Sequence, residues 1–251
     1  MSSSLPVRKR VVGVIPARLA STRLPGKVLL PVAGEPLLAW VYRAAERCPQ
    51  LDELLVATDS AEVEALCHEY GWRAMRTSPD LPSGTDRLFA VSQQVEADIY
   101  VNIQGDEPLL RPEHLRDLLA PFSHPAAEVT TLKVRCAPAE IDNPNAVKVV
   151  TATDGRALYF SRAPIPYDRE HSGRAEYFKH LGLYAYRRAA LKRFASLPLS
   201  TLEKTEKLEQ LRLLENGLAL YVTETAYDTI GVDTAEDLAR VEALLLQHAS
   251  R

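Results

Sequence analysis

VVGVIPARLASTRLPGK, residues 11–27 of this 251-residue chain, carries the clearest evidence of its fold class. Its first five residues form an unbroken apolar run rich in β-branched side chains, which predicts a strand buried on both faces. A loop carrying Pro, Gly, Ser and Thr follows, and residues 36–42 then begin a helix with proline in its first turn. This order of strand, loop and helix indicates an α/β fold.

The same order is repeated towards the middle of the chain. Further strands are expected at residues 54–58 and 99–103, and helices are expected to start near residues 60 and 112. Strands that alternate with helices predict a doubly wound, mainly parallel sheet. Because ligands bind such sheets beyond the carboxyl ends of the strands, the loops after Ile15 and Ile103 are the candidate site.

The pattern changes at about residue 129. Segments 147–151 and 157–160 flank a turn with Asp154–Gly155, which is a hairpin signature, and another strand is expected at 182–186. We therefore expect one domain over residues 1–251, with an antiparallel elaboration at about 129–200 for sugar binding or dimerisation. Two more helices are expected, one over residues 206–216 closed by Gly217 and one starting near Thr234 with a capping box to Asp237.

Composition excludes several classes of protein. The chain is 46% hydrophobic and 25% charged, with a net charge of −3, so we expect neither nucleic acid nor an anionic membrane as a partner. The three cysteines have no metal-ligand spacing and are expected to be free thiols in a reducing compartment. Pro16 and Arg18 interrupt the apolar run too early for a signal peptide. The sequence thus predicts a cytoplasmic protein without a membrane span.

The first chemical motif is the basic loop at residues 15–27. It places Arg18, Arg23 and Lys27 within ten residues of one another, directly after a buried strand. Neutralising a triphosphate requires several such cations together with backbone N–H groups at a strand end. The alternative is a solvated basic loop. The spacing matches neither a Walker A loop nor a dinucleotide-binding Gly-x-Gly-x-x-Gly turn.

Two acidic residues are candidate metal ligands. Asp106 lies in residues 104–108, after the strand ending at Ile103, where a carboxylate near a triphosphate suits Mg²⁺. The alternative is an aspartate that forms a turn beside Gly and Pro. Asp233 precedes the last helix, so its local sequence favours an ordinary N-cap. Both roles are compatible if Thr234 caps the helix while Asp233 points into the site.

Seven further segments extend the pattern that the basic loop begins. Together and in this order they make the chain resemble the CMP-Kdo synthetases, which are the 3-deoxy-manno-octulosonate cytidylyltransferases, and more distantly the CMP-sialic acid synthetases. Each segment alone is weak, but the resemblance runs from about residue 11 to about residue 243. The segments are SGTDR (83–87), NIQGDEP (102–108), NPNAVK (143–148), YFSR (159–162), HLGLY (180–184), LEQLR (208–212) and GVDT (231–234).

The resemblance implies a nucleotide-diphospho-sugar transferase-like fold and a set of nucleotide contacts. It implies that Asp106 and Asp233 are the ligands of Mg²⁺ and that Arg18, Arg23 and Lys27 neutralise the charge on the phosphates. The residues implied to border the nucleotide elsewhere are Pro16, Ala17 and Gln104 at the cytosine or ribose and Ser83, Gly84 and Arg87 beside them. Leu81 departs from the family pattern, in which a histidine is common two residues before this serine, so position 81 is left out of the site.

The resemblance also implies a pocket for an acidic sugar. An anionic polyol requires one cation for its carboxylate and several hydrogen-bonding groups for its hydroxyls. The residues implied are Arg162 for the carboxylate and His180, Tyr184, Glu209 and Gln210 for the remainder of the sugar. Taken one at a time, these side chains are equally compatible with a surface arginine, a core histidine or tyrosine, and solvated helix residues.

The implied reaction is attack of the anomeric hydroxyl of Kdo on the α-phosphorus of CTP, which gives CMP-Kdo for lipopolysaccharide biosynthesis and pyrophosphate. Such transfers depend on positioning and charge neutralisation and need no covalent intermediate. The resemblance also implies a homodimer. Alternatives are a cytidylyltransferase for 8-amino-8-deoxy-Kdo or for sialic acid and, more remotely, a non-catalytic nucleotide-binding regulator.

Overall fold

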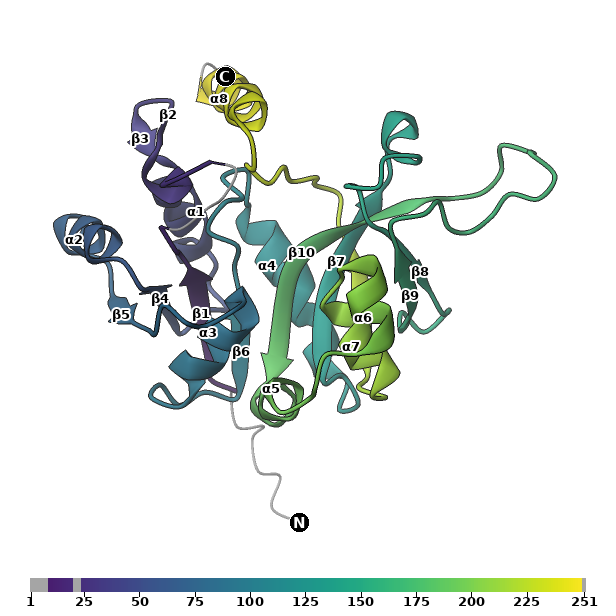
Figure 1. Ribbon diagram of the computed structural model, residues 1–251, viewed down its shortest axis with the longest axis horizontal. Coiled ribbons are helices and arrows are strands. Elements are labelled where there is room, and N and C mark those ends of the chain that lie inside the picture. The colour runs from purple at the N-terminus through teal and green to yellow at the C-terminus, as the bar shows by residue number, and fades with distance from the viewer. Residues whose placement is uncertain (1–8, 20–23, 250–251) are drawn as a thin grey trace, which may run out of the picture.

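Strand β1 (Val11–Pro16) lies inside a nine-stranded mixed sheet whose main path runs β11-β7-β10-β6-β1-β4-β5 (Figure 1). The computed structural model describes residues 9–19 and 24–249. The other strands of this sheet are β4 (Glu53–Thr58), β5 (Ala74–Arg76), β6 (Ile99–Asn102), β7 (Val129–Arg135), β8 (Lys148–Thr151), β9 (Ala157–Ser161), β10 (Phe178–Arg187) and β11 (Leu220–Glu224). Strands β2 (Pro31–Val32) and β3 (Glu35–Pro36) form a separate ribbon.

Helices cover both faces of the sheet. The α-helices are α1 (Leu37–Glu46), α2 (Ala61–Glu69), α3 (Gly84–Ser92), α4 (Pro112–Leu119), α5 (Arg188–Ala195), α6 (Thr201–Glu206), α7 (Gln210–Glu215) and α8 (Ala235–Ala249). Three short 3₁₀ turns are η1 (Lys27–Leu29), η2 (Ala120–Ser123) and η3 (Pro138–Glu140). The core of one face is built with α1, α2, α4 and α8, and that of the other with α3, α5 and α7.

Strand β1 is buried on both faces, as its apolar run predicts. Val12 and Val14 point into one core, whereas Val11 and Ile15 point into the other. It pairs in parallel with β4 and β6, and β4 pairs in parallel with β5. The doubly wound α/β prediction is therefore confirmed, and the carboxyl ends of β1 and β6 open at the same edge of the sheet.

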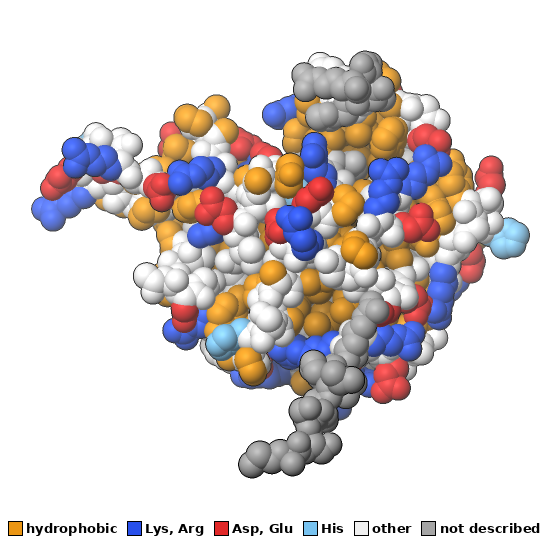
Figure 2. Space-filling model, turned by 180° about the vertical axis from the view of Figure 1, so that it is seen from behind, with side chains coloured by type: hydrophobic (Ala, Val, Ile, Leu, Met, Phe, Trp, Pro, Cys, Tyr) orange, Lys and Arg blue, Asp and Glu red, His pale blue; other side chains and the backbone are white. Residues whose placement is uncertain are grey.

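The antiparallel part is built around β10, which runs against both β6 and β7. Strands β8 and β9 form the predicted hairpin, with Gly155 at φ 85° in its turn, and β8 also pairs with β10. The loop between β9 and β10 projects away from the sheet (Figure 1). On the face shown in Figure 2, acidic and basic side chains are interspersed.

The helix predicted over residues 206–216 is confirmed at its end but not at its start, because α7 spans Gln210–Glu215 and Gly217 follows it with φ 68°. Helix α6 ends at Glu206, Lys207 adopts a left-handed conformation with φ 55°, and α7 begins only at Gln210. The break has a tertiary cause, because Arg162 Nε donates to the Glu206 carbonyl at 2.7 Å and its Nη2 donates to the Lys207 carbonyl at 3.3 Å. These carbonyls are bound from outside the helix instead of by the next turn.

The last helix begins as predicted. Thr234 Oγ1 accepts the Asp237 N–H at 3.1 Å, and Asp237 Oδ2 accepts the Thr234 N–H at 2.9 Å, which is a reciprocal capping box. Over residues 9–19 and 24–249, no helix is both long enough and apolar enough to cross a membrane.

Candidate active site

Three chain segments meet at the carboxyl ends of β1 and β6. They are η1 with Lys27, the turn after β6 with Asp106, and the segment before α8 with Asp233. Lys27 Nζ donates to Asp106 Oδ2 in a short contact, to Asp233 Oδ1 at 3.1 Å and to the Val232 carbonyl at 3.0 Å. The fold thus brings one cation and two carboxylates of the predicted site together.

The Lys27 ammonium is held in its charged form. Burial by itself lowers the pKa of Lys27, but the negative charges and hydrogen bonds of Asp106 and Asp233 outweigh burial and raise that pKa above its ordinary value. The Lys27 side chain is 13% exposed, whereas those of Asp106 and Asp233 are 29% and 44% exposed. The carboxylates therefore remain open to a ligand arriving from solvent.

The segment that carries Asp233 is fixed at both of its ends. Val232 N–H donates to the Asp106 carbonyl at 2.9 Å, and the Asp233 N–H donates to Asp237 Oδ2 at 3.1 Å. Because Thr234 and Asp237 cap α8, the Asp233 side chain is turned towards Lys27. In this geometry both predicted roles are compatible, since Thr234 caps the helix while Asp233 faces the site.

The backbone around Pro16 is closely packed against the turn after β6. A Cβ atom on Gly105 would lie 2.8 Å from the Pro16 carbonyl oxygen, so only glycine allows the two segments to approach this closely. Ala17 N–H donates to the Ala57 carbonyl at 2.9 Å. Since proline has no N–H and the Ala17 N–H is already bonded, the backbone of Pro16 and Ala17 can offer hydrogen-bond acceptors, but no donors, to a nucleotide base. Gln104 Nε2 donates to the Gly182 carbonyl at 3.3 Å.

The start of α3 borders the same region. Ser83 caps the helix by accepting the Asp86 N–H at 3.1 Å, and a Cβ on Gly84 would meet the Pro16 ring at 3.5 Å. Arg87 faces elsewhere. It is 2% exposed, ion-paired with Asp59 at 3.0 Å and hydrogen-bonded to Thr77. Arg87 thereby ties α3 to the segments that follow β4 and β5, and its contact with a nucleotide stays a prediction.

The sugar-site predictions on β10 fall on a polar cluster in which His180 is half-buried and Tyr184 is buried. His180 Nε2 lies 2.9 Å from the Tyr184 hydroxyl and 3.0 Å from Thr131 Oγ1. Burial lowers the pKa of His180 to about 3 and raises that of Tyr184 well above its ordinary value, so both groups are neutral hydrogen-bonding partners. The cluster sits at a β-bulge, because the pairing of β10 with β7 shifts register between Leu181 and Tyr184.

Glu209 joins the start of α7 to the start of α3. Its carboxylate accepts from Thr85 Oγ1 at 2.9 Å and from Ser83 Oγ at 3.2 Å. Burial raises the pKa of Glu209 even though both hydrogen bonds oppose the change. Gln210 is buried beside it, and its Nε2 has no hydrogen-bond partner within the described residues. An unpaired buried donor is costly, which makes Gln210 a natural contact for a ligand hydroxyl.

Arg162 uses its guanidinium within the protein. Besides the carbonyls of Glu206 and Lys207, it donates from Nη1 to the Pro144 carbonyl at 2.9 Å. The side chain thus ties the end of β9 to α6 and to the segment before β8. A sugar carboxylate would have to share or replace these donors, so the predicted role of Arg162 remains a prediction. Arg18 is exposed after β1, and Arg23 lies outside the described residues.

The comparisons with known proteins identify the family of this chain. Residues 12–225 match the model of a family described as cytidylyltransferase. The chain is 63% identical over 237 residues to a 3-deoxy-manno-octulosonate cytidylyltransferase of Acidobacterium capsulatum, covering 94% of this chain and 97% of that protein. The chain belongs to the 3-deoxy-manno-octulosonate cytidylyltransferases.

Two further similarities extend over almost the whole chain. A 3-deoxy-manno-octulosonate cytidylyltransferase of Koribacter versatilis is 56% identical over 236 residues, covering 94% of this chain and 90% of that protein. The solved structure of a CMP:2-keto-3-deoxy-manno-octonic acid synthetase in complex with CTP superposes with a TM-score of 0.92 at 46% identity, covering 95% of this chain and 99% of that one.

Two buried polar residues of this cytidylyltransferase were not singled out from the sequence. Asn102 ends β6 and is 1% exposed, with its Oδ1 unpaired within the described residues. Glu107 follows Asp106, and burial, followed by the charge of Asp106, raises its pKa to about 8. Both lie in the NIQGDEP segment. For Asn102, the sequence signal that could have been used is a polar side chain at the end of an apolar strand.

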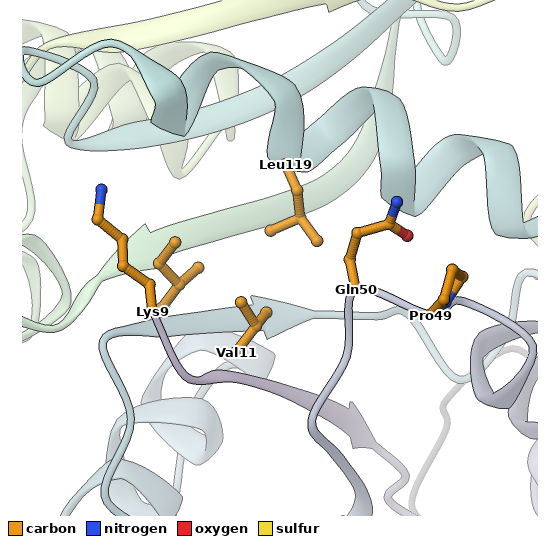
Figure 3. A pocket seen from close by; sticks show the side chains of 6 residues that line it. Lys9, Val11, Pro49, Gln50 and Leu119 are labelled. Carbon is orange, nitrogen blue, oxygen red and sulfur yellow. The ribbon is translucent and has the colours of Figure 1, made fainter. Parts of the chain in front are cut away.

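Among the cavities formed by the described residues, one lies at the amino end of β1 and one beside the basic loop. One of about 400 Å³ opens at the amino end of β1, between Lys9, Gln50 and Leu119 (Figure 3). Another of about 790 Å³ lies between η1 and the start of α2 and is lined mainly by apolar side chains, including Leu19 and Leu29. The second cavity borders the basic loop at Pro25 and Gly26, next to Lys27.

Proposed function

We propose that this chain transfers the CMP group of CTP to the anomeric hydroxyl of Kdo and releases pyrophosphate. The observation that carries the proposal is the near full-length match to relatives named for this activity, at identities up to 63%. The convergence of Lys27, Asp106 and Asp233 at the sheet edge supports it, because a transfer from a triphosphate requires cations and metal-binding oxygens at one point.

The basic loop would bind the triphosphate. Lys27 is fixed at the sheet edge and charged, and Arg18 is exposed at the start of the same loop. Their charges would stabilise the negative charge that builds on the phosphates as pyrophosphate leaves. Arg23, in the same loop, would add a third cation.

Asp106 and Asp233 would hold Mg²⁺. Their oxygens already converge on one cation, the Lys27 ammonium, and hard carboxylate oxygens are the ligands that Mg²⁺ prefers. Groups of three or more metal-ligating side chains do not occur over residues 9–19 and 24–249. This fits an ion that takes its remaining ligands from phosphate and water. When bound, Mg²⁺ would supply charge neutralisation at the phosphates and lower the pKa of the attacking hydroxyl.

The nucleoside would lie across the turn after β6. Pro16 and Ala17 offer backbone acceptors, which suit the exocyclic amino group of cytosine, and Gln104 adds a side-chain amide. The capped start of α3 at Ser83 and Gly84 would close the other side. The main chain would thereby read a small pyrimidine edge with little help from side chains.

The sugar would sit over the β10 bulge. His180, Tyr184, Glu209 and Gln210 offer neutral donors, acceptors and a carboxylate for the hydroxyls, and Arg162 would orient the sugar carboxylate. We favour Kdo over its 8-amino-8-deoxy analogue and over sialic acid. The product would serve lipopolysaccharide biosynthesis.

A homodimer would form through the antiparallel elaboration. Leu158 on β9 and Tyr167 in the projecting loop are large apolar side chains that are 60% and 77% exposed. Burying such side chains at a subunit interface is favourable. Analytical ultracentrifugation of the wild type and of Tyr167→Asp tests this assignment, with a shift from dimer to monomer expected in the variant.

A pyrophosphate-release assay tests the reaction. CTP is supplied with Kdo, with 8-amino-8-deoxy-Kdo or with sialic acid at equal concentration, and kcat/KM is compared among them. We expect the highest value with Kdo, loss of activity in EDTA and recovery with Mg²⁺. A preference for the amino sugar would overturn the substrate assignment alone. If none of the three sugars supports pyrophosphate release, the proposed reaction itself is overturned.

A further inference from the structure

The Lys27 ammonium has all of its hydrogen bonds satisfied inside the protein. An ammonium carries three N–H donors, and Lys27 has three acceptors, which are Asp106 Oδ2, Asp233 Oδ1 and the Val232 carbonyl. No N–H donor is left over for a phosphate oxygen. If Lys27 binds the triphosphate, it must therefore give up at least one of these partners.

The position of this ammonium is set by the fold. Lys27 is the first residue of η1, which begins after Gly26 in a left-handed conformation (φ 67°), and the next residue, Val28, is 3% exposed in the core. The Leu30 N–H donates to the Lys27 carbonyl and closes the turn at 3.2 Å. The backbone is thereby fixed close to the carboxylates, and only the flexible side chain of Lys27 can change partners.

The two carboxylates need a cation between them. Asp106 and Asp233 both contact the same ammonium, so their charges lie within a few ångströms of each other and repel in the absence of a positive charge. In this structure the Lys27 ammonium contacts both carboxylates and is one source of that charge. A divalent ion that entered by itself would have to displace an ammonium that has its full set of partners.

We propose that Lys27 is the resident counter-cation of the Asp106–Asp233 pair and exchanges those carboxylates for phosphate oxygens when metal and triphosphate arrive together. This inference rests on the proposed function. The exchange leaves every charge paired, since the metal takes the carboxylates and the ammonium takes the phosphate. Metal binding to the nucleotide-free protein is weak as a result, and the metal enters with the nucleotide rather than before it.

Mn²⁺ binding to the protein without nucleotide tests the proposal. Electron paramagnetic resonance counts free Mn²⁺, and the wild type is compared with Lys27→Gln, which removes the charge but keeps a similar length. We expect Lys27→Gln to bind Mn²⁺ at least about tenfold more tightly, a difference of about 1.4 kcal/mol. Lys204→Gln, at an exposed position on α6, changes the net charge equally and should bind Mn²⁺ like the wild type.

Further variants connect the effect to the carboxylate pair. Adding Asp233→Asn to Lys27→Gln should abolish the gain, and Lys27→Arg, which retains a cation, should stay close to the wild type. If Lys27→Gln is poorly folded, Lys27→Met gives the same test. With either variant, the melting temperature without nucleotide should rise with Mg²⁺ more than it does for the wild type.

The outcomes separate this inference from the proposed reaction. Mn²⁺ affinity that is unchanged or weakened in Lys27→Gln would overturn it, because Lys27 would then help to organise the metal site instead of occupying it. A gain that survives Asp233→Asn would also overturn it. If the wild type releases no pyrophosphate with any sugar but Lys27→Gln gains Mn²⁺ affinity, the reaction is wrong and the role of Lys27 stands.

Discussion

Replacing Glu107 by glutamine should make folding stability less dependent on pH. Glu107 is 8% exposed, and its Oε2 lacks a hydrogen-bond partner within the described residues. A Cβ atom on Gly182 of β10 would lie 3.4 Å from Glu107 Oε1, so the carboxyl group is pressed against backbone rather than solvent. Burial, followed by the charge of Asp106, raises its pKa from 4.5 to about 8. Glutamine keeps the shape of the side chain without the acid.

The sign follows from the two pKa values. Between pH 4.5 and about 8, Glu107 is neutral in the folded chain but ionised in the unfolded chain. The unfolded state then binds fewer protons, so the free energy of unfolding falls as the pH rises through this window. At about 1.4 kcal/mol for each pH unit, the whole window corresponds to a loss of about 3–5 kcal/mol. Glu107→Gln has no ionisable group at this position, so its free energy of unfolding does not fall in this way.

Urea unfolding from pH 4.5 to pH 9, followed by circular dichroism in EDTA, measures this difference. We expect the free energies of the wild type and Glu107→Gln to diverge steadily with pH, with the variant the more stable above pH 8. Glu170→Gln, an exposed glutamate in the projecting loop, is the matched control and should keep the wild-type slope. Parallel pH profiles for the wild type and Glu107→Gln would refute the assignment of a neutral buried carboxyl group.

Three further changes test other contacts. Asp233→Asn should lower turnover at least about tenfold while the melting temperature is retained, since Thr234 and Asp237 still cap α8; full turnover would leave Asp233 without a catalytic role. Gly105→Ala should cost about 1–3 kcal/mol in urea unfolding and raise the KM for CTP, because its Cβ would meet the Pro16 carbonyl; an unchanged KM would mean that this contact does not shape the nucleotide site. Arg212→Ala should cost about 3–5 kcal/mol of stability, because Arg212 Nη2 and Nε bind the buried Glu203 carboxylate at 2.6 and 2.8 Å. If the Arg212→Met, Glu203→Met double variant recovers this stability, the loss comes from the unpaired Glu203 charge. If it does not recover, the loss comes from packing.

Several features of the site could be predicted from the sequence because their causes are local or shared within the family. The order of the motifs along the chain predicts that Lys27, Asp106 and Asp233 belong to one site. What the sequence did not indicate is that Lys27 contacts both carboxylates at once, across 79 and 206 positions of the chain. Arg87 and Arg162 illustrate the same limit, since Arg87 pairs with the half-buried Asp59 and Arg162 pairs with backbone carbonyls.

Elements whose pattern lies within a few neighbouring residues can be predicted from the sequence. The apolar run at residues 11–15 made a doubly buried strand, and the spacing of Thr234 and Asp237 made a helix cap, because burial on both faces and reciprocal capping are written in neighbouring side chains. The break at Lys207 and the partners of the charged groups depend instead on contacts between residues far apart in the chain. A helix stops when a distant donor such as Arg162 binds its carbonyls, and an ion pair forms with whichever opposite charge the fold brings within reach. Neither event leaves a periodic signal in the chain.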